Sequence, residues 1–184
     1  GPSLDEIVVL HLPWVESSGA KGQQAILSDL NLSGEDLRDV NLAAAKFDRG
    51  VLFETNFSGA DLAMADLSMS DSRGANFRHA DLRGALLQRG VFNGCDFSEP
   101  DAIDDTDDHE WSANLEYAKF AGANFIHANL RNTNLAGADF SGADLTGADF
   151  TNATVTSANF FGATVVEAKF DGVDLSTIRR NSEI

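Results

Sequence analysis

The stretch ANLRNTNLAGADFSGADLTGADF, residues 128–150, repeats one unit every five residues. A large apolar residue stands at the centre of each unit, as at Leu135, Phe140 and Leu145, and a small residue precedes it by two positions. The residue between these two is Asp or Asn. A period of five fits neither a helix nor a strand. It predicts a chain that turns a corner every five residues, so that one large and one small side chain point inward each time.

The same register extends over most of the chain. Fifteen centres run from Leu27 to Phe97, and thirteen more run from Leu115 to Leu175. Of these 28 centres, 14 are Leu, 11 are Phe, two are Val and one is Ser72, while the small residue is Ala at 18 positions. A register held over so many units excludes coincidence and identifies the chain as an internal-repeat protein. Four corners close a square coil of about twenty residues, so the units predict about seven coils.

Units such as Ala60-Asp61-Leu62 resemble those of the pentapeptide-repeat family, and the resemblance covers roughly residues 25–97 and 113–175. It implies an all-β fold, a right-handed quadrilateral parallel β-helix of about seven coils, which is a solenoid. Each coil would bury its Leu, Phe and Ala side chains against the coils above and below. The Asp or Asn before each centre would point outward and hydrogen-bond the nearby backbone at the corner.

The repeat boundaries divide the chain into five segments. These are a tag remnant and N-terminal cap (1–24), repeat coils (25–97), an acidic projecting loop (98–112), further repeat coils (113–175) and a C-terminal tail (176–184). Within the cap, residues 1–3 resemble the remnant of a cleaved tag, and residues 7–12 predict a strand followed by an aromatic plug at Trp14. The tail is too short for a substantial helix, so that end is either poorly capped or buried in a homodimer.

The register breaks between Phe97 and Leu115, where the spacing is 18 residues and one unit would take five, leaving 13 extra. Residues 98–112 hold seven carboxylates and no Lys or Arg. Loops of this length are uncommon in compact domains and are often functional. We therefore expect this segment to contact a partner, through the residues Asp101, Asp104, Asp105, Asp107, Asp108, Glu110 and Trp111.

Clustered carboxylates also suit Ca²⁺, but the segment lacks the central Gly and the flanking helices of an EF-hand loop. A solvated acidic loop is the alternative, and the sequence leaves the choice open. We expect no cofactor.

The path through the break decides which inner side chains stack. If the chain advances by one wall, one column reads Leu42, Leu62, Leu82, Leu115, Leu135, Val155 and Leu175. Its Phe-rich neighbour then reads Leu37, Phe57, Phe77, Phe97, Leu130, Phe150 and Phe170. Steps of two or three walls also fit the register. We expect the one-wall step, which places Leu115 above Leu82.

Residues that could carry chemistry are scattered. Cys95 occupies a small-residue position and is expected to be an apolar filler, and Ser72 is expected to be held by a backbone hydrogen bond. The four histidines are predicted to lie on the surface, at positions His11, His79, His109 and His127. No catalytic set or zinc spacing stands out, and a filled column has no cleft. The sequence therefore predicts a binding protein that is not an enzyme.

Composition narrows the class of partner. The net charge of -16 excludes routine binding to nucleic acid or anionic membrane, which require Lys and Arg. It allows an acidic decoy, a basic protein partner or simple solubility. A single cysteine favours a reducing compartment, and the sequence shows neither a signal peptide nor an apolar run of membrane-spanning length, so we expect a cytoplasmic protein.

The family resemblance implies a protein-binding scaffold. One branch of the family resembles a negatively charged DNA-like rod and protects the type II topoisomerases DNA gyrase and topoisomerase IV from inhibitors, which makes topoisomerase binding the most specific hypothesis. Against it stand Arg73, Arg78 and Arg83, the mild charge of the repeat walls and the absence of a C-terminal dimerisation helix. A general interaction scaffold, or a secreted effector or lumenal protein with an unrelated partner, are the alternatives.

Overall fold

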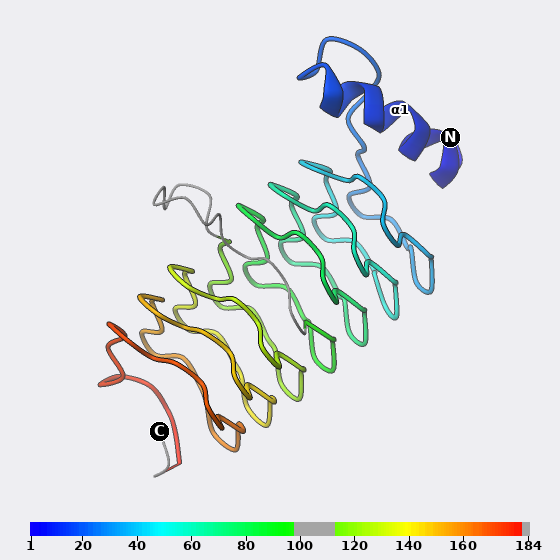
Figure 1. Ribbon diagram of the computed structural model, residues 1–184. Helices are drawn as coiled ribbons and strands as arrows, with labels where there is room; N and C mark the ends of the chain where they lie inside the picture. The colour runs from blue at the N-terminus through cyan, green and yellow to red at the C-terminus, as the bar shows by residue number, and fades with distance from the viewer. Residues whose placement is uncertain (98–112, 182–184) are drawn as a thin grey trace.

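The computed structural model describes residues 1–97 and 113–181 (Figure 1). Helix α1 (Leu4–Glu16) lies at the N-terminal end of a column of stacked coils. Among these residues α1 is the only helix, and the coils are joined by isolated parallel bridges instead of longer strands. The predicted parallel solenoid is therefore present. No helix in the described part of the chain is long and apolar enough to cross a membrane.

Backbone hydrogen bonds tie each coil to the next. Away from the break at residues 98–112, the bridges join residues 20 apart, as in Lys119 with Asp139, where Asp139 N donates to Ala118 O (2.9 Å) and Phe120 N donates to Asp139 O (2.7 Å). We name the four walls in chain order, so that their first centres are Leu27, Leu32, Leu37 and Leu42. The bridging places the coil starts at residues 25, 45, 65, 85, 113, 133 and 153. These starts belong to the described residues, and the total of about seven coils remains a prediction.

Each corner combines a left-handed residue with a side-chain cap. The second residue after the centre has a positive φ of 55–72° at each corner from Asp29 to Gly94 and from Tyr117 to Gly172. Just before the centre, an Asp or Asn side chain accepts the N–H two residues later, as Asp144 Oδ1 does from Thr146 N (3.0 Å). This bond stabilises the corner conformation, which most non-Gly residues disfavour. The outward, backbone-bonded placement of the repeat's Asp and Asn is confirmed.

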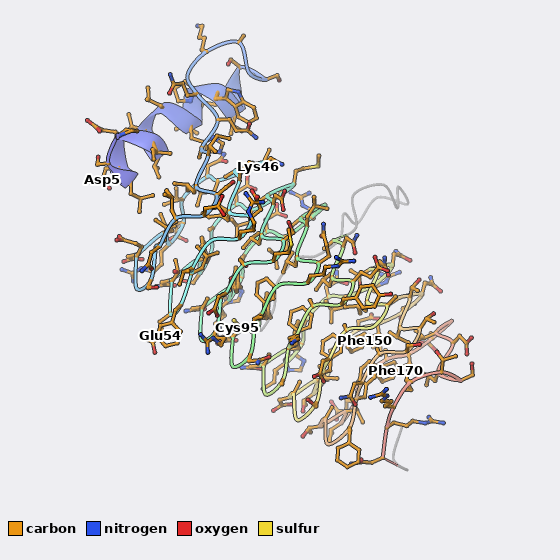
Figure 2. The ribbon with its side chains drawn as sticks, turned by 180° about the vertical axis from the view of Figure 1, so that it is seen from behind. Asp5, Lys46, Glu54, Cys95, Phe150 and Phe170 are labelled. Atoms are coloured by element: carbon orange, nitrogen blue, oxygen red, sulfur yellow. The ribbon has the colours of Figure 1, made fainter. Side chains whose placement is uncertain are left out.

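Phenylalanine rings stack along the inside of the column. On the third wall, consecutive centroids are 4.7–5.1 Å apart with nearly parallel planes, in the order Phe57, Phe77, Phe97 and Phe125. On the second wall the separations are 5.1–5.6 Å, in the order Phe92, Phe120, Phe140 and Phe160. Edge-to-face contacts join the two walls, as between Phe97 and Phe120 at 86°. Phe150 and Phe170, labelled in Figure 2, add a fourth-wall pair at 5.0 Å.

The predicted one-wall step across the break is wrong. Leu87 N donates to Asn114 O (2.8 Å), so Leu115 lies on the wall of Leu87 and not above Leu82. Phe97 is followed on its wall by Phe125 and not by Leu130. A Phe-rich stack exists, but its members beyond Phe97 differ from those predicted. The physical reason is that residues joined across the break are 28 apart, so this coil exceeds a normal one by eight residues and not by 13.

The N-terminal cap is a helix, so the strand predicted at residues 7–12 is wrong. Ser3 Oγ accepts from Glu6 N (3.2 Å), and the Glu6 carboxylate accepts from Ser3 N (2.8 Å), which is a capping box. Leu4, Ile7 and Val8 then follow the helical spacing and pack against the first coil.

The linker between α1 and the coils passes very close to the helix. Gln23 N donates to Leu10 O (2.9 Å). A Cβ on Gly22, at φ +69°, would lie 2.3 Å from the same Leu10 oxygen. Only glycine fits there. This close contact fixes the position of α1 against the column.

Of the three described histidines, only His11 departs from the predicted surface position. It is fully buried, its Nδ1 accepts from Ala25 N (3.1 Å), and its ring stacks on Trp14 at 5.5 Å. His79 and His127 are exposed, as predicted, and His109 lies outside the described residues. Burial lowers the pKa of the His11 imidazole from its ordinary 6.5.

The parallel pairing continues past the last predicted unit. Phe160 N donates to Arg179 O (2.7 Å), and Arg179 N donates to Ala158 O (2.9 Å). The predicted tail therefore joins the column at least to Arg179. Phe170 and Leu175 are partly buried against the core. The homodimer expected through this end remains a prediction.

Truncating a stacked ring should be far more costly than changing a corner carboxylate. Phe140 is fully buried between Phe120 and Phe160, so Phe140→Ala should lower the free energy of unfolding by about 3–5 kcal/mol. Asp139→Ser should cost much less, because serine retains a short polar side chain beside the corner N–H. Phe161→Ala, at a position 64% exposed, is the matched control. Chemical denaturation measures all three, and equal losses would contradict the inward and outward assignments.

Acid should weaken the N-terminal cap through His11. The folded chain holds its imidazole neutral, whereas the unfolded chain protonates it near pH 6.5, so unfolding takes up a proton below that pH. The stability that neutral His11 contributes is complete above 6.5 and is lost as the pH falls towards the lower pKa of the folded state. Wild type and His11→Gln should be compared by denaturation from about pH 7.5 to 5.5, so that carboxylates common to both cancel. The advantage of the wild type should shrink with acid, and a constant difference would contradict this.

Candidate functional site

The interior of the column offers no reactive group. Cys95 is buried, burial raises the pKa of its thiol to about 12, and its Sγ donates to Ser72 O (2.7 Å). The predicted filler role fits, because the reactive species is the thiolate. Ser72 Oγ bonds the Ser70 hydroxyl (2.9 Å), so the expected Ser72 side-chain bond to the backbone is not the one found. Within residues 1–97 and 113–181 no cluster of His, Cys, Asp or Glu could hold a metal ion.

The predicted partner-contact residues fall outside the described residues. They are Asp101, Asp104, Asp105, Asp107, Asp108, Glu110 and Trp111. The structure instead shows how the coil before these residues pairs with the coil after them. Three walls pair directly across the break, through Leu86 with Asn114, Val91 with Lys119 and Asp96 with Asn124.

A recess of about 340 Å³ lies on the first wall, where the chain rejoins the column. Three successive coils line it, through Ser68, Met69, Gln88, Arg89, Asn114, Glu116 and Tyr117. Met69 and Tyr117 are exposed by 50% and 54%, and the buried Gln88 Oε1 has no hydrogen-bond partner among the described residues. An unpaired buried acceptor is costly, so it would gain from a donor supplied by a partner. The recess therefore combines two apolar contacts with an unsatisfied amide.

Tyr117 is held in place by the coil that follows. A Cβ on Gly137, at φ +66°, would lie 2.4 Å from Tyr117 Cδ1, so the ring lies directly over the glycine. Only the absence of a side chain at Gly137 leaves room for this ring. Tyr117 is thus a rigid, half-exposed aromatic side chain, the kind of residue that anchors protein interfaces.

Arginine partly neutralises the carboxylates of the walls. Arg73 contacts Asp71 at 2.7 Å and Arg83 contacts Asp81 at 2.5 Å, in each case from two residues later. The hydrogen bonds from the Arg73 guanidinium hold the pKa of the Asp71 carboxyl below its usual value. These pairs agree with the mild wall charge expected from the sequence.

The recess was missed by sequence reasoning, although one signal was present. Met69 and Tyr117 occupy the left-handed corner position, where small or polar residues are favoured. A bulky side chain at that position indicates a surface role. Recognising that Gln88 and Glu116 share a wall, however, requires the 28-residue step across the break.

Comparisons with known proteins agree with the fold. The pentapeptide-repeat family profile matches eight copies over residues 36–71, 73–102, 113–152 and 138–176. Pentapeptide repeat protein MfpA of Mycolicibacterium smegmatis is 33% identical over 69 residues, which are 38% of this chain and about a third, 34%, of MfpA.

Two solved structures resemble the chain at low sequence identity. QnrB1, described as a plasmid-mediated fluoroquinolone resistance protein, is 21% identical, with 86% of this chain and 88% of that one covered and a TM-score of 0.49. HetL of the cyanobacterium Nostoc sp. strain PCC 7120 is 20% identical, with 97% of each chain covered and a TM-score of 0.31. With the family profile matched over both blocks of coils, the chain belongs to the pentapeptide-repeat family.

Proposed function

We propose that this protein is a non-enzymatic scaffold that binds a basic protein surface through residues 98–112 and the adjoining recess on the first wall. The observation that carries the proposal is the direct pairing of three walls across the break. Because those walls close without the segment, its eight surplus residues serve no need of the column. An acidic insertion that the fold does not require is a candidate for a binding element.

Charge supports a basic partner. The segment 98–112 carries seven carboxylates without a base, which is nearly half of the net charge of -16. Many carboxylates of the walls are engaged in corner bonds or arginine pairs, as at Asp144 and Asp71. Attraction between such a segment and a basic surface speeds association and weakens as salt is added. Tyr117 and Met69 would add apolar contact beside it.

The finer proposal is that the partner is a type II topoisomerase, DNA gyrase or topoisomerase IV. These enzymes present a basic surface to DNA, and an acidic rod could occupy it. Support comes from the negative net charge and from membership of a family in which one branch has this activity. A cytoplasmic location belongs to the same proposal.

Shortening the long coil to 20 residues should leave the column intact. Removal of residues 105–112 together with Pro100→Ala and Ala102→Leu restores a normal coil, because alanine supplies the corner N–H that proline lacks, and should change the melting temperature by no more than about 2 °C. Removal of residues 100–112 is the control, because it turns every later coil by one wall and sets Leu130 in place of Phe125 next to Phe97. The control should melt distinctly lower, and equal melting would show that the Phe stacks do not fix the register.

Neutralising the segment should remove partner binding without unfolding the protein. The test variant carries Asn at positions 104, 105, 107 and 108, and the matched control carries Asn at positions 139, 144, 149 and 174. Both lose four charges, and the control retains an acceptor at each corner. A gyrase supercoiling assay, with and without a fluoroquinolone, should show about a tenfold weaker effect for the test variant and little change for the control.

Two results would limit the proposal. If wild type has no effect on gyrase, the topoisomerase part is wrong, and capture of partners from the source cell tests the scaffold part alone. If the neutralised variant binds its partner as well as wild type at several salt concentrations, the contact lies on the walls and not in the segment.

A further inference from the structure

Helix α1 is apolar on both faces. Its inner side chains pack on the first coil, while Val9 is 71% exposed, Leu12 43% and Leu10 41%. A helix that only covers the end of a column would carry polar residues on its outer face. Scattered apolar residues on a surface are normal, but three on one short helix require a test for contiguity.

Two hollows in the surface are lined by residues of α1, and one of them also reaches the first coil. One, of about 510 Å³, is lined by Pro2, Asp5, Glu6, Val9 and Leu10. The other, of about 190 Å³, is lined by Pro2, Ile7, Leu10, Gln23, Gln24 and Ile26. The two hollows share Pro2 and Leu10, so together they extend from the outer face of α1 to Ile26 on the first wall, and we call them the groove. Ile26 extends it with a side chain that is 56% exposed.

The charged residues of this groove are all acidic. Asp5 and Glu6 line it, and Asp5 projects from α1 into solvent (Figure 2). One carboxylate oxygen of Glu6 accepts the capping hydrogen bond from Ser3 N. Asp5 has no ion-pair partner among the residues that the structure describes. The groove thus joins an apolar floor to a negative edge, which complements an apolar stripe flanked by Lys or Arg.

Other occupants fit less well. A second copy would bring its own Asp5, Glu6 and Glu16 to the contact against a single base, Lys21, in residues 1–24. Like charges facing each other oppose association. An anionic membrane would be repelled by the same edge and by the net charge of -16.

We propose that the outer face of α1 and Ile26 form a second interaction surface, which binds an amphipathic basic helix of a protein partner. The apolar stripe of that helix packs on Val9, Leu10 and Ile26, and its flanking Lys or Arg pairs with Asp5. Binding of a helix in a groove is a common mode of recognition, read through apolar residues at i, i+3 and i+4. None of its residues belongs to the segment 98–112.

The probe is a fluorescently labelled Leu/Lys peptide of about 18 residues, long enough to form an amphipathic helix. A scrambled Leu/Lys peptide of the same charge and an amphipathic Leu/Glu peptide are the controls. Fluorescence anisotropy should show binding of the amphipathic Leu/Lys peptide that is at least about tenfold tighter than that of either control.

Val9→Glu, at a position 71% exposed, tests the groove, and Phe161→Glu, at a position 64% exposed, is the matched control. Both variants become more negative, so non-specific attraction predicts tighter binding of the Lys peptide to each of them. The proposal predicts the opposite for the groove variant, a loss of about tenfold or more, with little loss for Phe161→Glu. Circular dichroism and melting confirm that both variants are folded.

Three results would overturn the proposal. The first is equal or tighter peptide binding by the groove variant, or equal binding of the scrambled peptide. The second is a dimer in analytical ultracentrifugation that the groove variant abolishes while peptide binding is unchanged, which would assign the surface to a second copy. The third is cosedimentation with phosphatidylcholine vesicles that depends on Val9, without peptide binding, which would assign it to a lipid surface.

Discussion

The structure depends on one constraint, which is that the chain must turn a corner every five residues. Each corner requires a left-handed residue, and this conformation is unfavourable for Met69 or Tyr117 but easy for Gly137. The Asp or Asn side chain before the centre offsets part of that cost by accepting an N–H across the corner. Burial of the Leu or Phe centre then stabilises the closed coil, and so do the hydrogen bonds between coils. These positions of the repeat unit therefore each have one structural role, which leaves little freedom of residue choice inside the column.

Because every wall has the same repeat pattern, the sequence reveals the fold but not which walls stack on each other across the break. The five-residue pattern shows which side chains point inward, and the structure confirms this for the repeat centres from Leu27 to Phe97 and from Leu115 to Phe160. It cannot show which wall the chain meets after an insertion, because any number of whole units fits the same pattern. Only the hydrogen bonds between coils decide this, and they place Leu115 beside Leu87. Near-parallel rings on the third wall, such as Phe97 on Phe125, favour the same choice.

The strand predicted in the N-terminal cap was wrong for a different reason. The β-branched composition was given more weight than a local signal for a helix. The β-branched residues Ile7, Val8 and Val9 favour a strand, and the capping box from Ser3 to Glu6 favours a helix. Tertiary contact decides between them, because a helix covers the open end of the first coil with Leu4, Ile7 and Val8 together. The same packing buries His11, which the sequence gives no reason to expect. The acidic segment, in contrast, is visible from the sequence, since its charge and the break in register coincide.

Because the repeat assigns each regular position to the fold, sites of interaction are best sought where the pattern fails. Places of this kind include the surplus residues in the long coil, the bulky corner residues Met69 and Tyr117, and the outer face of α1. The second lies where the described chain resumes, since Asn114 lines the recess. The third lies at the N-terminal end (Figure 1). The recess and the outer face of α1 lie on one column of stacked coils, so a partner that engages both gains from their preorganised spacing without new contacts.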